Sequence, residues 1–114
     1  MEFYSLIMKY EVVFILNESI VVSDEVDNFS KDFSDRISKL GGSIIEKNVL
    51  GSKKFARTLK KKYNFGFYLH FIFILENRSS IIELNSSYKL DERIIRKMFL
   101  VCTRDDKKKL QEDN

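Results

Sequence analysis

The chain is poor in the residues on which disulfide and metal chemistry depend. It has one cysteine, Cys102, so an internal disulfide cannot form. No histidine or second cysteine stands near Cys102 in the C-x-x-C or C-x-x-H spacing of zinc sites. We therefore expect a protein of a reducing compartment that has no metal site.

Long apolar runs and proline are also absent. The longest apolar run, residues 65–75, contains His70 and has the length of a strand, whereas a membrane-spanning helix needs about 20 residues. Charged residues interrupt the apolar opening of the chain, which shows no small-residue cleavage site. We expect no membrane association and no secretory signal. Without proline, the ends of the predicted elements are defined by glycine and by changes in hydrophobic period.

Motifs for catalysis are missing as well. His70 is the only histidine, and no serine, cysteine or aspartate stands beside it in a nucleophile motif. The chain contains neither G-x-G-x-x-G nor G-x-x-x-x-G-K, the glycine-rich motifs that hold nucleotide phosphates. The aromatic run around His70 favours packing or stacking over proton transfer. We expect a protein that is not an enzyme, with no cofactor and no small-molecule substrate.

The charge that is present is distributed unevenly. The 114-residue chain carries a net charge of +3. Residues 1–46 hold four basic and nine acidic side chains, residues 47–62 hold seven basic and no acidic ones, and residues 63–114 hold nine basic and eight acidic ones. The positive charge is therefore local, as in a surface that binds an anionic partner.

The hydrophobic pattern predicts six elements in the order βαββαβ. Alternating, β-branched and aromatic segments indicate strands at residues 10–16, 43–59, 65–75 and 98–103, and a helical period indicates helices at residues 23–40 and 80–88. Gly41 follows the first helix as its expected stop. Ser80 and Glu83 have the spacing of a capping box. Gly51 and Ser52 interrupt the second strand with either a hairpin or a bulged bend.

Two helices packed on one face of a four-stranded sheet leave the other face open. On strand 65–75, alternation gives the helix-covered face Phe65, Phe67, Leu69, Phe71, Phe73 and Leu75. The open face receives Gly66, Tyr68, His70, Ile72 and Ile74 from this strand, and Val13 and Ile15 from the first strand. This face is more apolar than contact with water alone favours, so it requires a cover or a partner.

The basic run beside this strand has two interpretations. Its basic side chains include Lys53, Lys54, Arg57, Lys60, Lys61 and Lys62. Charge runs are often only solvated surface. These residues, however, adjoin a sheet face that carries Tyr68 and His70, and sheet surfaces bind RNA by combining phosphate neutralisation with base stacking. The sequence therefore predicts a nucleic-acid interface here.

Three segments of the chain are similar to one known family. They are MKYEVVFIL at residues 8–16, LGSKKFARTL at residues 50–59 and YKLDERIIRKMFLV at residues 88–101. In their order and spacing they resemble the sixth small-subunit ribosomal protein family of bacteria and organelles. The resemblance covers roughly residues 8–103 as a single domain. It leaves residues 1–7 as an N-terminal extension and residues 104–114 as a polar C-terminal tail.

The resemblance implies both a fold and a function. The fold is a ferredoxin-like α+β sandwich, with a four-stranded antiparallel sheet and two helices on one face. The function is to bind small-subunit ribosomal RNA in the central platform, together with the eighteenth small-subunit protein, in support of assembly and translation. The expected location is the ribosome of a bacterial cytoplasm, and an organellar ribosome is the alternative.

The family pattern can be carried over by position. It assigns Lys53 and Lys54 to phosphates and Phe55 and Leu59 to packing. Further positions that the resemblance matches for RNA binding are Tyr68, His70, Arg93 and Arg96, of which the first two serve either RNA or the protein partner. The chain departs from the family at residues 57–58, where Arg-Thr replaces the usual Tyr-Pro, and at residue 70, where larger aromatics are common. These departures imply a less protected strand edge and weaker stacking.

Two other classes of small α+β protein have the same predicted order of elements. An acylphosphatase-like enzyme needs an arginine-containing phosphate loop after the first strand, but residues 16–25 contain no arginine. A ligand-sensing or dimerising module that pairs through its open sheet face suits the apolar residues there. It gives no reason for the basic run at residues 47–62. The dimerising module is retained as the alternative.

Overall fold

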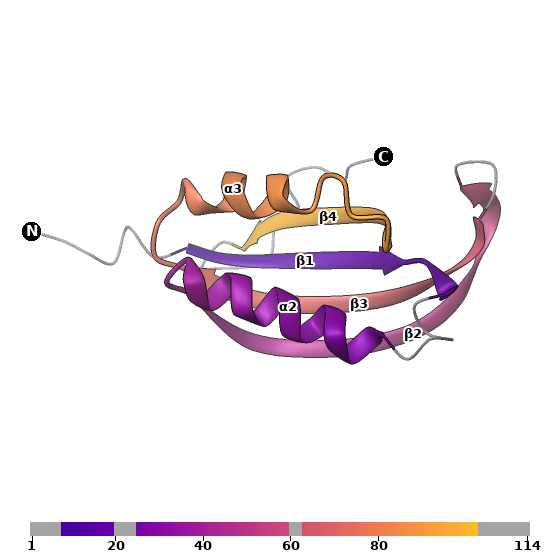
Figure 1. The fold of residues 1–114 in the computed structure, drawn as a ribbon, viewed down its shortest axis with the longest axis horizontal. Helices are drawn as coiled ribbons and strands as arrows, with labels where there is room; N and C mark the ends of the chain where they lie inside the picture. The colour runs from indigo at the N-terminus through magenta and orange to yellow at the C-terminus, as the bar shows by residue number, and fades with distance from the viewer. Residues whose placement is uncertain (1–7, 20–24, 60–62, 103–114) are drawn as a thin grey trace, which may run out of the picture.

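The computed structural model describes residues 8–19, 25–59 and 63–102, with the backbone alone at residues 56–59. Its elements (Figure 1) are β1 (Met8–Leu16), α2 (Val26–Lys39), β2 (Ser43–Leu59), β3 (Tyr63–Leu75), α3 (Ser80–Ser87) and β4 (Ile94–Cys102). The expected order βαββαβ is therefore confirmed. The ends differ, because β1 and β4 both begin earlier than the pattern predicts. Residue 23, the expected start of the first helix, lies outside the described residues.

The four strands form one antiparallel sheet in the order β2-β3-β1-β4. β1 and β3 lie in the centre, and β2 and β4 form the edges. Both helices cover the same face, since Phe14 of β1 contacts Phe29 of α2 and Tyr88 directly after α3. The fold is thus the ferredoxin-like α+β sandwich that the sequence predicts.

An aromatic cluster around Phe14 holds the helices on the sheet. In the described chain, the Phe14 ring meets five others edge-on at centroid distances of 4.9 to 6.2 Å: Phe29, Phe33, Phe71, Tyr88 and Phe99. Each such pair adds about 0.5–1.5 kcal/mol beyond the burial of the rings. The core therefore lies between the helices and the centre of the sheet, and neither described helix covers the other face of the sheet.

α2 ends in a tight turn that leads directly into β2. Gly41 adopts φ = 80°, and its N–H donates to the Ser38 carbonyl at 3.0 Å. The Gly42 N–H donates to the Ile37 carbonyl at 2.9 Å. This pair of bonds is a Schellman motif, whose left-handed residue is most easily glycine. The expected helix stop at Gly41 is confirmed.

β2 is one long strand with a bulge. At Gly51 the backbone adopts φ = 88°, and the pairing register with β3 shifts between Val49 and Gly51. Glycine adopts this left-handed conformation without the penalty that a Cβ atom would add. Of the two expected alternatives, the bulged bend is confirmed and the hairpin at this point is wrong.

β2 and β3 extend past the rest of the sheet. Leu16, the last residue of β1, pairs with Phe67, and the β3 residues before Phe67 pair with β2 alone. We call this extension, residues 53–59 and 63–66, the arm; Figure 1 shows it curling away beyond the ends of α2 and β1. Phe65 lies in the arm and is 47% exposed, so the expectation that the helices cover this residue is wrong. Neither helix reaches far enough to cover it.

The start of α3 also differs from the sequence pattern. The helix begins at Ser80, and no side-chain hydrogen bond caps its N-terminus. The hydroxyl of the preceding residue, Ser79, donates instead to the Asn77 side-chain oxygen at 2.8 Å. The expected capping box of Ser80 and Glu83 is therefore wrong. Neither described helix is long and apolar enough to cross a membrane.

Candidate nucleic-acid interface

The antiparallel register arranges the open face of the sheet in rows. Taken across β2, β3, β1 and β4, the first row is Gly51, Tyr68, Ile15 and Arg96, the second is Asn48, His70, Val13 and Met98, and the third is Glu46, Ile72, Glu11 and Leu100. Beyond the first row, the arm adds Lys53 opposite Gly66. Tyr68 and His70 therefore lie on the face where alternation predicts them.

One end of the open face combines positive charge with aromatic rings. We call Lys53, Phe55, Tyr68 and Arg96 the basic end. The Lys53 ammonium lies 5.8 Å from the centroid of the Tyr68 ring, within cation–π range. The Phe55 ring centroid lies 6.5 Å from that of Tyr68. Tyr68 and Arg96 flank Ile15 in one row, two strand spacings or about 10 Å apart, so all four side chains can contact one bound molecule.

A glycine allows the basic end to pack. Phe55 lies over Gly66, where an added Cβ atom would stand 2.6 Å from Phe55 Cζ and 2.4 Å from Ile15 Cγ2. Any larger residue at position 66 would displace one of these side chains. Ile15 is accordingly buried although it is on the open face. The packing role expected for Phe55 agrees with these contacts.

His70 is held between polar groups. Its Nε2 lies 2.6 Å from Glu11 Oε2, and its Nδ1 lies 3.0 Å from the Asn48 side-chain nitrogen. Because that nitrogen can only donate, Nδ1 accepts, and Nε2 carries the proton and donates to Glu11. The Asn48 nitrogen also donates to Glu46 Oε2 at 2.9 Å. The His70 side chain is only 14% exposed, so little of its ring is available to a base.

Sequence reasoning did not find this polar network. The only signal for it is the charge of Glu11 at an open-face position of a mostly apolar strand. The involvement of Asn48 depends on the β2–β3 register, which shifts at the bulge between Val49 and Gly51.

Arg93 lies on the helix side of the sheet, where its guanidinium forms ion pairs with carboxylates. It binds Asp91 through two nitrogens, with Nη2–Oδ2 at 2.6 Å and Nε–Oδ1 at 2.9 Å. Its Nη2 is also 3.6 Å from Asp32, and its guanidinium is 4.8 Å from the Phe29 ring centroid. Hydrogen bonding to Asp91 raises the pKa of Arg93. The structure thus brings Arg96 to the basic end but does not bring Arg93 there.

The remaining residues of the predicted interface are Lys54 and the basic residues of segment 57–62. Lys54 is exposed and pairs with Phe65, so it faces the opposite side of the arm from Lys53. Arg57 belongs to β2 by its backbone, while its side chain lies outside the described part of the chain. Residues 60–62, which include the predicted Lys60, Lys61 and Lys62, are also outside it.

Charge divides the open face. Lys53 and Arg96 supply positive charge at one end, whereas Glu11 and Glu46 place two carboxylates in the third row. An anionic ligand is therefore attracted to the basic end and repelled from the middle of the sheet. Among the described residues, no group of three or more acidic, histidine or cysteine side chains is placed to hold a metal ion.

The chain was compared with known protein families. The family model for ribosomal protein S6 matches residues 9–100. The chain belongs to the ribosomal protein S6 family. Three curated members carry the name small ribosomal subunit protein bS6. Those of Magnetococcus marinus, Flavobacterium psychrophilum and Lactobacillus helveticus are 28%, 32% and 29% identical over 76%, 76% and 79% of this chain. The match spans 58% of the first of these proteins, 74% of the second and 90% of the third.

A solved structure of the S6 family has the same fold. The crystal structure of 30S ribosomal protein S6 from Thermotoga maritima superposes with a TM-score of 0.74 at 26% sequence identity. The alignment covers 83% of this chain and 87% of that protein. The resemblance that the sequence motifs indicate is therefore confirmed for both family and fold.

Proposed function

We propose that this protein is a structural constituent of the small ribosomal subunit that binds small-subunit ribosomal RNA. In this proposal residues 8–103 form one RNA-binding domain in the central platform, beside the eighteenth small-subunit protein. The protein supports assembly of the subunit and catalyses no reaction. The S6 relatives support the small subunit, and their bacterial sources support a cytoplasmic ribosome. The observation that carries RNA binding is the Lys53 ammonium over the Tyr68 ring, within a segment of seven basic and no acidic residues.

Phosphate contacts supply most of the affinity in this proposal. Lys53, Arg96 and the other basic residues of segment 47–62 neutralise phosphates and release counterions. Five or six such contacts give a log–log slope of affinity against salt of about −4 to −5. Tyr68 adds a stacking surface at the same end. Such an interface follows the shape of the RNA backbone more than its base sequence.

The middle of the open face suits a second protein better than RNA. Val13 and Met98 are partly buried apolar residues of the second row, and the carboxylates of Glu11 and Glu46 follow in the third. These carboxylates repel phosphates but attract a basic side chain of a protein. We therefore assign Tyr68 to RNA and the surroundings of His70 to the protein partner.

A titration with a central-domain RNA fragment tests the proposal. It is done at two salt concentrations, with and without the eighteenth protein. We expect tight, salt-sensitive binding that the second protein strengthens. The double variant Lys53→Gln/Lys54→Gln should lower the steepness of the salt dependence by about two, because two phosphate contacts are lost. The matched control Lys31→Gln/Lys89→Gln removes two exposed lysines outside the basic segment and should bind as the parent does.

The opposite result would favour the alternative function. A protein that binds the RNA under neither condition, but sediments as a dimer, would assign the open face to self-association. The basic segment would then be a solvated edge.

A further inference from the structure

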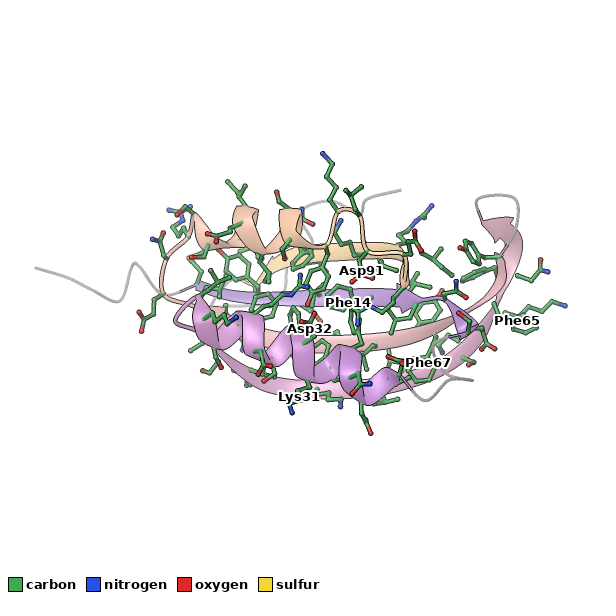
Figure 2. All side chains as sticks on the ribbon, viewed as in Figure 1. Phe14, Lys31, Asp32, Phe65, Phe67 and Asp91 are labelled. Atoms are coloured by element: carbon green, nitrogen blue, oxygen red, sulfur yellow. The ribbon has the colours of Figure 1, made fainter. Side chains whose placement is uncertain are left out.

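Phe65 is an exposed aromatic side chain that does not belong to the buried core. It is 47% exposed and makes no ring contact with another aromatic residue of the described chain. Figure 2 shows it at the curled end of the sheet, whereas Phe67, two residues further along the same face, lies nearer to α2. Phe67 is 9% exposed. The core thus ends between these two residues, and Phe65 is presented to the surroundings.

The arm carries a basic and aromatic pair on each of its faces. On the open face of the sheet, Lys53 and Phe55 adjoin Tyr68. On the opposite face, Lys54 stands directly across from Phe65 in the strand register. Cross-strand neighbours have Cβ atoms about 5 Å apart, so Lys54 and Phe65 can contact the same small group. The described part of the arm therefore presents two surfaces of similar composition.

We propose that Phe65 stacks on an unpaired base of the ribosomal RNA while Lys54 contacts a neighbouring phosphate. The arm then contacts RNA on both faces. This inference rests on the proposed function and adds to it a residue on the side of the sheet away from Tyr68. Aromatic side chains bind unpaired bases by stacking, and adjacent positive charge holds the backbone of the same strand.

The charge of the arm favours RNA over a second copy of this chain as the occupant. Segment 47–62 has seven basic side chains and no acidic one, so two arms in contact would repel each other. The other exposed apolar side chains of the described residues differ from Phe65 in shape. They are Ile45, Val49, Leu50, Ile82 and Leu90, and none of them has a flat ring that could stack on a base.

Substitution of Phe65 separates this inference from the proposed function. The full-length variants Phe65→Ala and Phe65→Tyr are titrated with the central-domain RNA fragment at several salt concentrations. We expect Phe65→Ala to weaken binding roughly 5- to 150-fold, the range for loss of one stacked base. The steepness of the salt dependence should not change, because no charge is removed. Phe65→Tyr keeps a flat ring and should bind nearly as the parent does. Ile82→Ala is the control for loss of an exposed apolar side chain and should have no effect.

A second measurement reports contact directly. RNA that contains 4-thiouridine is irradiated in the complex, and the crosslinked residue is identified by fragmentation of the peptide that contains residues 63–78. A crosslink at Phe65 supports the inference. Parent-like affinity of Phe65→Ala, with weakened binding of Lys53→Gln/Lys54→Gln, would overturn the inference and leave the proposed function standing. If Phe65→Tyr lost as much affinity as Phe65→Ala, stacking would be rejected as the role of the ring.

Discussion

At the scale of single residues, Asp91 is a mostly buried carboxylate that is held by Arg93. Its side chain is 12% exposed and accepts hydrogen bonds from the side chain and the backbone N–H of Arg93. Burial alone would raise the pKa of Asp91, but these hydrogen bonds and the charges of Arg93 and Arg36 outweigh it. The pKa therefore lies below its ordinary value of 3.8. The folded state thus prefers the ionised form more strongly than the unfolded state does.

This preference makes the contribution of Asp91 depend on pH. A depressed folded-state pKa contributes stability above the unfolded-state value, and this is lost as the pH falls below about 4. We expect Asp91→Asn to lower the free energy of unfolding by about 1–2 kcal/mol at pH 7, because charge-assisted hydrogen bonds to Arg93 are weakened. The loss should shrink at pH 3. Urea unfolding at both pH values measures it, with Glu92→Gln as an exposed neighbouring control. A loss of equal size at both would contradict the argument.

For His70, the sequence predicts the face of the sheet but not the hydrogen-bond partners. Alternation along an aromatic strand is enough to place His70 on the open face. Its hydrogen bonds to Glu11 and Asn48 depend on the register of three strands, because these two residues lie 59 and 22 positions away from His70 along the chain. No local pattern carries that information. The face of a residue could thus be predicted, but its partners could not.

At the scale of elements, glycine is required at two positions for different physical reasons: Gly42 lies in the turn between α2 and β2, and Gly51 lies at the bulge within β2. A Cβ atom at Gly42 would stand 2.1 Å from the Ile74 carbonyl oxygen, so the close packing of the α2–β2 turn against β3 excludes it. At Gly51 nothing lies within 4 Å of an added Cβ, but the backbone has φ = 88°. The first position is limited by space and the second by backbone conformation.

Alanine substitutions distinguish the two reasons. We expect Gly42→Ala to lower the free energy of unfolding by more than about 2 kcal/mol, since β3 backbone must move. Gly51→Ala should cost about 1 kcal/mol, the penalty for an L-residue in the left-handed region. Urea unfolding of both variants measures the difference. If both variants lost the same free energy of unfolding, the turn after α2 would be able to move away from β3 at little cost, in contradiction to the argument from space.

The elements themselves were largely predictable, because their hydrophobic periods are strong. The failures occurred where tertiary structure decides. Phe65 continues the alternation of β3, yet it is exposed because the helices end before the arm begins. Ser80 and Glu83 have capping-box spacing, but α3 starts one residue too early in the chain for Ser80 to serve as the cap, and Ser79 holds the N-cap position instead. Spacing alone does not show how far a neighbouring element reaches.

At the scale of the whole molecule, the fold followed from element order, and the uneven charge predicts where an anionic partner would bind. The division of the open face was not predictable. Glu11 and Arg96 are far from Glu46 and Lys53 in the sequence, and only the sheet order β2-β3-β1-β4 places these basic and acidic residues on one surface. A net charge of +3 does not reveal this division.

The division predicts that RNA and protein binding can be impaired separately. Lys53→Gln removes one phosphate contact and should reduce the steepness of the salt dependence of RNA binding by about 0.9, with affinity for the eighteenth protein unchanged. Glu46→Gln keeps an oxygen to accept the Asn48 hydrogen bond but removes the charge. It should weaken protein binding by up to about fivefold at low salt, the usual limit for an exposed ion pair. RNA affinity should stay the same or rise slightly, because a carboxylate near the phosphates is neutralised. Separate titrations with RNA and with the protein measure both effects. If either variant impaired both interactions equally, the two partners would share one surface, and the assignment of the acidic third row to protein would be rejected.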